Sequence, residues 1–283
     1  YRITNEGSAV GLFSNRNHHA MFLAACLPLL AFEMSFAAKS RELAVARSWI
    51  GAAVGLLFVA VIVTTGSRAG IAIGALALAS LPFLYRQPDI RGGRGRLERG
   101  IDLKRRGKWI IAALAVLLVA FATSSALLER IAESDGSDEM RWQIWPPIVQ
   151  ATWRLFPVGS GAGTFVEAYQ VIEPIRLLGD RYVNHAHNDL LEVAMTLGLP
   201  GLLLIGVAVY AWIRLALPLW RAGLTDPQVH LGRVGSVVTL AFALGSLADY
   251  PLRTPSVSAF FIMGALWMVQ GGTLLNAQRQ SGG

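Results

Sequence analysis

Charged residues are scarce in this chain of 283 residues, where they make up 15% of the sequence against 54% for hydrophobic residues. Soluble domains carry about 25% charged residues, so much of this protein's surface is expected to face lipid. Cysteine is almost absent as well. The one cysteine, Cys26, has no partner within the chain, which excludes a disulfide-stabilised scaffold. Intrinsic disorder is excluded because disordered chains are polar and poor in aromatic residues.

Long apolar runs, by contrast, are frequent. A membrane-spanning helix needs about 20 mostly apolar residues, and seven segments approach this length. They are residues 17–38, 48–65, 69–85, 109–128, 189–213, 234–248 and 256–274. We therefore predict an all-α, polytopic membrane protein in which residues 1–283 form a single membrane-embedded domain.

Lysine and arginine are distributed unevenly between the connecting segments. Residues 86–108 contain nine of them against three acidic residues, which predicts a basic cytoplasmic loop. Such a loop could also attract anionic lipid head groups. Because the chain changes sides at each predicted span, the large loop at residues 129–188 lies on the opposite side of the membrane. The net charge of +7 is thus explained by topology, and no nucleic-acid partner is expected.

The side opposite the basic loop has a distinctive set of polar residues. Its nine basic residues are all arginine, whose planar guanidinium suits phosphate and carboxylate groups. Four of the five histidines, His18, His19, His185 and His187, also lie there. We expect chemistry on this side. No ligand spacing typical of zinc or magnesium sites is present, so we expect neither a metal nor a cofactor.

Two arginines on this side lie in recognisable local patterns. Arg68 lies in the tight turn at residues 64–70, where it either binds an anion or anchors a helix end at the membrane surface. Arg141 precedes residues that recur at helical spacing, namely Trp142, Trp145, Val149 and Trp153. This spacing predicts an amphipathic helix at the membrane surface and leaves the role of Arg141 open.

The most informative pattern is the polar run at residues 184–192, directly before the fifth predicted span. Asn188 or Asp189 can cap that helix. His187 then precedes a helix N-terminus, whose dipole disfavours the imidazolium form, and a neutral imidazole can accept a proton. His187 is therefore a candidate general base. The glycine run at residues 159–163 most simply forms a turn, although its N–H groups could also cradle a phosphate.

Together these motifs resemble the O-antigen ligase and polymerase family of bacterial membrane glycosyltransferases. His187-Asn188, nine residues, then Gly198-x-x-Gly201 fits the family's H-N-x9-G-x-x-G signature. Three further pieces agree in order, namely the run at residues 11–17, the turn at residues 67–70, and Arg141 with its tryptophans followed by Pro157-x-Gly-x-Gly-x-Gly. The resemblance covers residues 11–201.

The resemblance implies a GT-C-like helical enzyme of the bacterial inner membrane, with residues 129–188 as a large periplasmic loop. Such an enzyme moves a glycan from undecaprenyl diphosphate to an acceptor hydroxyl at the periplasmic face, by an inverting, metal-independent reaction. Arg68, Arg141 and His187 map to the family's catalytic residues. His185, Asn188 and, on the same face, Arg253 are expected to contact substrate.

Several alternatives stay open at this stage. The acceptor would be lipid A–core for a ligase, another lipid-linked glycan repeat for an O-antigen or exopolysaccharide polymerase, or Ser or Thr for a protein-directed relative. A transporter or flippase is disfavoured because transporters place ionisable groups near the bilayer midplane, and here only Glu33 lies inside a predicted span. If the protein were instead a structural membrane subunit, the arginines and histidines on the outward side would have no catalytic role. The resemblance also leads us to expect further helices before residue 1 in the complete protein.

Overall fold

The structure is a computed structural model that describes residues 9–86, 88, 136–178, 182–223 and 226–281. The elements in these residues are α-helices and two short 3-10 helices. In chain order they are α1 (Arg16–Met34), α2 (Arg41–Thr64), α3 (Arg68–Leu84), α6 (Gly136–Leu155), α7 (Phe165–Gln170), η1 (Ile175–Leu177), α8 (Asp189–Arg221), α9 (Pro227–Gly245), η2 (Pro251–Arg253) and α10 (Pro255–Ser281).

Six of the seven predicted spans coincide with helices. Three of these helices, α2, α8 and α10, are long and apolar enough to cross a membrane. The most apolar window of α2 and of α8 is only 11% buried inside the protein, as expected for surfaces that face lipid. The helices α1, α3 and α9 overlap three further predicted spans. The fourth predicted span and nearly all of the basic loop lie outside the described residues, so the count of seven stays a prediction.

Several helices extend beyond the predicted spans, since α2 begins at Arg41, α8 ends at Arg221 and α10 ends at Ser281. The sixth span was expected at residues 234–248, but α9 begins at Pro227. Asp226 caps this start, because its side chain accepts a hydrogen bond from the Gln228 N–H at 2.7 Å. Proline then occupies the first helical position, where its missing N–H costs nothing. Polar and charged residues in the first turns had hidden this start, since the prediction relied on apolar residues alone.

The packed centre of the molecule is formed by α1, α3, α9 and α10. Its buried residues include Ala20 and Ala24 of α1, Ile73 of α3 and Phe242 of α9. Small residues allow close approach where these helices cross. A Cβ atom on Gly235 would lie 2.3 Å from the Gly264 carbonyl oxygen, so α9 and α10 meet backbone to backbone.

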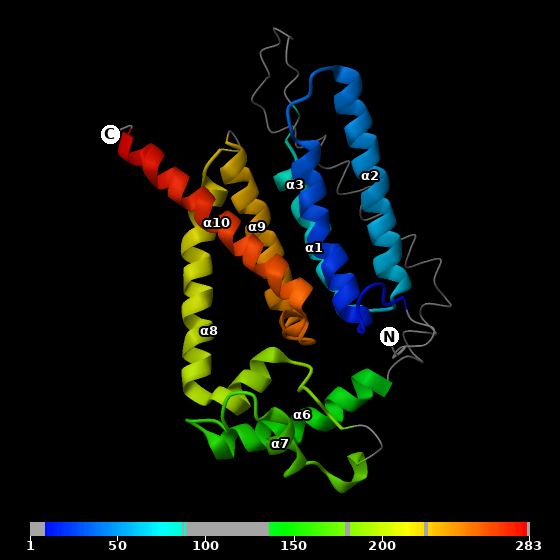
Figure 1. Cartoon of the computed structure of the whole chain (residues 1–283), viewed down its shortest axis with the longest axis vertical. Helices are drawn as coiled ribbons and strands as arrows, with labels where there is room; N and C mark the ends of the chain where they lie inside the picture. The colour runs from blue at the N-terminus through cyan, green and yellow to red at the C-terminus, as the bar shows by residue number, and fades with distance from the viewer. Residues whose placement is uncertain (1–8, 87, 89–135, 179–181, 224–225, 282–283) are drawn as a thin grey trace.

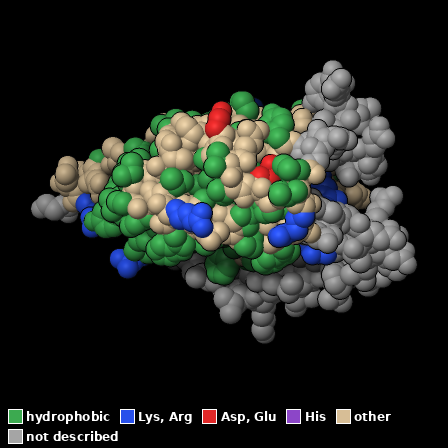
Figure 2. Space-filling model, turned by 90° about the horizontal axis from the view of Figure 1, so that it is seen from below, with side chains coloured by type: hydrophobic (Ala, Val, Ile, Leu, Met, Phe, Trp, Pro, Cys, Tyr) green, Lys and Arg blue, Asp and Glu red, His purple; other side chains and the backbone are tan. Residues whose placement is uncertain are grey.

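A second layer lies across one end of this bundle and contains α6 and α7 (Figure 1). The inner face of α6 buries Ile144 and Ile148 against Phe165 and Tyr169 of α7. Its outer face exposes Trp142 and Trp153, each by more than 70%. The predicted helix is thus confirmed, and its place at the membrane surface stays a prediction. Seen from this end, a few basic and acidic side chains lie among hydrophobic ones (Figure 2).

A break in α8 joins this second layer to the bundle. Gly198 has a left-handed φ of 56° inside the helix. The glycine loop after α6 fits into this break, where the N–H groups of Ser160 and Gly161 donate to the carbonyls of Met195 and Thr196 at 3.0 and 2.8 Å. The Leu199 N–H donates back to the Pro157 carbonyl at 2.8 Å. The loop is therefore a turn, as expected, but these N–H groups bind helix carbonyls and cannot cradle a phosphate.

This interlocking predicts that Gly198→Ala destabilises the protein. The new Cβ atom would lie 2.2 Å from the Pro157 carbonyl oxygen, at a backbone φ that alanine disfavours, and we expect a cost of about 2–4 kcal/mol. The measurement is the melting temperature of the purified protein. Gly206→Ala is the matched control, because Gly206 lies in the same helix with no atom within 4 Å of its would-be Cβ. Equal melting temperatures for wild type and Gly198→Ala would contradict this account of the break.

Candidate active site

A buried carboxylate, Asp249, forms the centre of a polar cluster where α1, α6, α8 and α9 meet. Asp249 follows the end of α9, and its side chain is completely buried. Its Oδ2 atom accepts hydrogen bonds from the side-chain amides of Asn15 at 3.0 Å and Asn17 at 2.6 Å. Its Oδ1 atom accepts one from the Tyr250 N–H at 3.0 Å and lies 3.2 Å from His187 Nδ1. A buried carboxylate with this many donors is held in one orientation.

Basic side chains from two further elements surround the same carboxylate. Arg141 of α6 places Nη2 3.7 Å from Asp249 Oδ2, and His18 of α1 places Nε2 3.7 Å from Oδ1. Burial alone would raise the pKa of Asp249, but hydrogen bonds and charge from His18 and His187 hold this pKa well below its usual range. A lowered pKa in the folded state means that ionised Asp249 stabilises the fold above pH about 4, and that this stabilisation is lost only on strong acidification.

His187 is positioned by the start of α8. It has a φ of 50°, the one non-glycine residue in the left-handed region within the described segments. It directly precedes Asn188, which caps α8 by accepting a hydrogen bond from the Leu191 N–H at 3.0 Å. With Nδ1 facing Asp249, the tautomer that donates Nδ1–H to the carboxylate leaves the Nε2 lone pair available. The His187 side chain is 15% exposed, so a substrate can reach it.

Tyr250 holds three histidine rings together. Its ring centroid lies 4.3 Å from that of His185 and 5.0 Å from those of His18 and His187. Burial and the charge of Asp249 raise the pKa of Tyr250, so its phenol stays protonated at neutral pH. The uncharged Tyr250 ring therefore packs against all three histidines and restricts their positions.

A second carboxylate, Glu192, holds His185 and Arg253. Its Oε1 atom lies 3.3 Å from His185 Nδ1 and 3.0 Å from Arg253 Nη2, and its Oε2 atom accepts the Ala186 N–H at 2.9 Å. Arg253 also donates Nε–H to Asp189 Oδ1 at 2.9 Å. Two carboxylates thus compensate the charge of Arg253, which fastens the loop containing Asp249 to the first turn of α8.

Arg68 lies at the same end of the bundle but outside the Asp249 cluster. It is the first residue of α3, and its side chain is exposed. Ser67 caps α3 and donates its hydroxyl to Asn17 Oδ1 at 2.6 Å. Asn17 also donates a hydrogen bond to Asp249. The Asn17 side chain therefore connects the turn that contains Ser67 and Arg68 to the Asp249 carboxylate.

The sequence therefore identified some members of this cluster and missed others. Arg141 and His187 contact Asp249 directly, whereas His185, Asn188 and Arg253 lie in the adjoining Glu192 network or cap α8. Asp249 itself was missed, along with Asn15, Asn17 and Tyr250. One signal could have found it, because Asp249 is the only acidic residue in the short outward loop at residues 249–255.

Among the residues that the structure describes, no group of three His, Cys, Asp or Glu side chains is arranged to hold a metal ion. His19 is also separate from the cluster, because its Nδ1 atom faces the Ala9 carbonyl at 3.0 Å and its ring stacks on Phe13.

Comparison with known proteins assigns the family. A family model described as O-antigen ligase matches residues 52–206, more than half of the chain. A search of curated protein sequences gives no significant match. The matched segment contains Arg68, Arg141, His187 and the glycines that interlock at the break in α8, and it ends before Asp249. Together with the helices able to cross a membrane, this match shows that the chain belongs to the O-antigen ligase family, as its motifs predicted.

Proposed function

We propose that this protein is a glycosyltransferase that moves a glycan from undecaprenyl diphosphate to an acceptor hydroxyl at the periplasmic face of the bacterial inner membrane. The observation that carries the proposal is the pairing of His187 Nδ1 with the buried carboxylate of Asp249 at 3.2 Å. A carboxylate that fixes the tautomer of a partly exposed histidine prepares the other ring nitrogen to take a proton.

The proposed reaction is a direct displacement. The acceptor hydroxyl oxygen forms a bond to the anomeric carbon of the glycan, and the bond from that carbon to the diphosphate oxygen breaks. The hydroxyl proton moves to His187 Nε2, where the Asp249 carboxylate stabilises the resulting imidazolium. Undecaprenyl diphosphate leaves as the anion. Because the acceptor attacks opposite the departing group, the anomeric configuration inverts.

Two arginines are suited to the charge that develops on the departing diphosphate. Arg141 lies beside Asp249 with 13% of its side chain exposed, and Arg68 presents an exposed guanidinium from the connected turn. Guanidinium groups bind phosphate oxygens through parallel N–H donors, and preorganised donors at a site of developing charge lower the barrier. Arginine thereby performs the charge neutralisation that a divalent metal performs in other transferases.

Arg68→Ala is expected to lower glycan transfer by the full-length protein by about 10²–10³-fold, since it removes one preorganised donor. Membrane abundance should stay unchanged because the side chain is exposed. Activity is measured as transfer from a lipid-linked glycan in membranes. Arg176→Ala is the matched control, because Arg176 is an exposed arginine of η1 and should be dispensable. Full activity of Arg68→Ala would remove Arg68 from the mechanism.

We further expect the reaction to survive excess EDTA, because guanidinium groups carry the proposed charge stabilisation. The measurement is the initial rate before and after chelation, followed by addition of Mg²⁺ or Mn²⁺. Loss of activity with EDTA that either ion restores would overturn the metal-independent mechanism.

The proposal includes ligases and polymerases alike, because both move a glycan from a lipid diphosphate to a hydroxyl. Offering lipid A–core, a second lipid-linked glycan and a Ser- or Thr-containing protein in parallel identifies the acceptor. A flippase would move the lipid-linked glycan between leaflets without breaking the bond to diphosphate, which the same experiment detects.

A further inference from the structure

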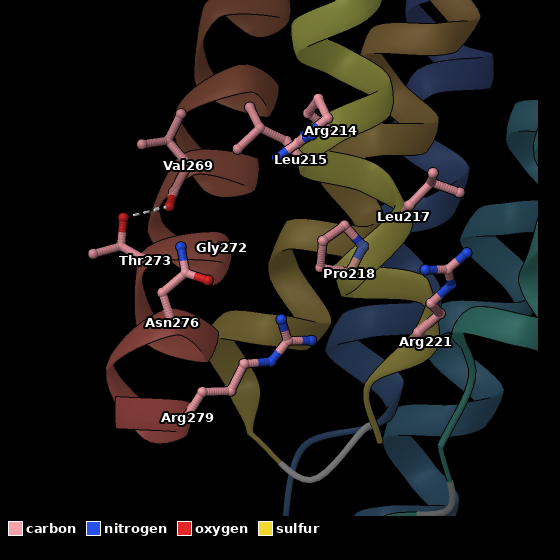
Figure 3. Close-up of a pocket in the computed structure, with 10 residues that line it drawn as sticks. All are labelled: Arg214, Leu215, Leu217, Pro218, Arg221, Val269, Gly272, Thr273, Asn276 and Arg279. Atoms are coloured by element: carbon pink, nitrogen blue, oxygen red, sulfur yellow. Dashed lines mark hydrogen bonds between the residues drawn. The ribbon is translucent and has the colours of Figure 1, made fainter. Parts of the chain in front are cut away.

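A cavity of about 430 Å³ lies between the C-terminal turns of α8 and α10. Arg214 and Arg221 of α8 and Arg279 of α10 line it, and Figure 3 shows Arg279 extending from α10 toward α8. Asn276 and Thr273 add polar groups on the α10 side. The cavity is therefore a hollow between two helices able to cross a membrane, with three cationic side chains around it.

The cavity lies far from the Asp249 cluster. The first residue of α10, Pro255, follows two residues after Arg253, and Arg279 lies 24 residues further along the helix. At 1.5 Å per residue this separation is about 36 Å, close to the roughly 30 Å thickness of a bilayer's hydrocarbon core. The cavity thus lies at the membrane surface opposite His187.

The three arginines have no acidic partner among the residues that the structure describes. Across the described segments, no carboxylate forms an ion pair with Arg214, Arg221 or Arg279. Arg221 and Arg279 occupy the last turns of their helices, where a cation interacts favourably with the helix dipole. Arg214 lies two turns earlier, where its guanidinium lies over the Tyr210 ring, 5.9 Å from the ring centroid. This contact leaves its charge without a carboxylate partner in the described segments. Three positive charges around one hollow, none of them paired with a carboxylate among the described residues, are complementary to an anion.

The helix faces that lead into the cavity are apolar. On α8, helical spacing places Leu203, Val207 and Tyr210 in one row with the two arginines. The side chains of these three apolar residues are each at least 60% exposed. On α10, the corresponding row is Ile262, Leu266, Val269, Thr273 and Asn276. Each row is therefore apolar along most of its helix and polar at the cavity. A small free anion would need only the polar end, whereas a ligand with apolar chains would use the whole row.

We propose that this cavity binds an anionic phospholipid. The three arginines would hold the phosphate of the head group, and the acyl chains would lie along the two apolar rows. Basic pockets between membrane helices suit anionic lipid head groups in this way. The site does not depend on the transfer reaction, because it shares no residue with the Asp249 cluster.

The test uses the purified full-length protein in nanodiscs of phosphatidylglycerol or phosphatidylcholine with the same acyl chains. We expect the melting temperature in phosphatidylglycerol to exceed that in phosphatidylcholine by about 5 °C or more. Arg214→Gln/Arg279→Gln should lose most of this difference and co-purify with about fivefold less phosphatidylglycerol by native mass spectrometry. The control Lys39→Gln/Arg41→Gln removes the same charge from exposed positions around the start of α2 and should behave as wild type.

Arg214→Lys/Arg279→Lys keeps both charges and should keep most of the phosphatidylglycerol effect, which separates lost charge from lost folding. The proposal is overturned if the glutamine variant keeps the full preference for phosphatidylglycerol, or if the control variant loses it equally. Equal stabilisation by inorganic phosphate in detergent would reject a lipid in favour of a free anion. Loss of an oligomer, with bound lipid unchanged, would instead assign the cavity to contact between protein copies.

Discussion

Replacing His187 is expected to lower glycan transfer by about 10²–10⁴-fold, the usual contribution of a general base, while membrane abundance stays unchanged. The expectation follows from the position of the ring, which is partly exposed and has Nδ1 against the buried Asp249 carboxylate. His18, the other histidine beside that carboxylate, has only 5% of its side chain exposed, so it is less accessible to a substrate. The measurement is the rate of glycan transfer by the full-length protein at matched protein level.

The choice of replacement matters, because His187 has a left-handed backbone. Alanine at a φ of 50° adds strain of its own, whereas asparagine tolerates this region. His187→Asn therefore removes the base and keeps the local backbone. His19→Ala is the matched control, since His19 lies in the first turns of α1 but faces the Ala9 carbonyl. If His187→Asn transferred glycan at the wild-type rate, His187 would not be the base.

Asp249→Asn is expected to have an effect of similar size on the maximal rate. An amide cannot stabilise a histidinium as a carboxylate does, and its N–H₂ group would face the donors of Asn15 or Asn17. The histidine would then lose the partner that fixes its tautomer. We expect kcat to fall by about 10²–10⁴-fold with little change in KM for the lipid-linked donor.

Asp226→Asn provides the control for this exchange. Asp226 caps α9 with its side chain, and asparagine caps a helix equally well, so both rate and stability should stay close to wild type. The melting temperature of Asp249→Asn should be measured beside kcat, because a buried network is being altered. A raised KM with unchanged kcat would assign Asp249 to substrate binding and contradict its role beside His187.

The sequence predicted the elements that depend on local patterns. Asn188 caps α8 and places His187 immediately before it, as the run of polar residues indicated. The tryptophan spacing around Arg141 correctly predicted a helix. Helix caps and helical periodicity involve residues a few positions apart, so a single sequence displays them directly.

The parts that were missed depend on contacts between distant residues. Asp249 meets Asn15 and Asn17 across more than 230 positions and His187 across 62. No local rule connects such residues, and an acidic residue in a short loop is usually solvated. The glycine run shows the same limit. Its turn was predicted, but the carbonyls that bind its N–H groups come from the break at Gly198, which only the folded chain brings near.

The most direct test of the account is a transfer assay with the full-length protein, reconstituted with a defined, labelled undecaprenyl-diphosphate glycan and the candidate acceptors in parallel. We predict that the wild type attaches labelled glycan to one acceptor, releases one undecaprenyl diphosphate for each transfer, and inverts the anomeric centre. We expect His19→Ala to do the same and His187→Asn to transfer almost none. Absence of transfer to every acceptor, or equal transfer by His187→Asn, would contradict the account.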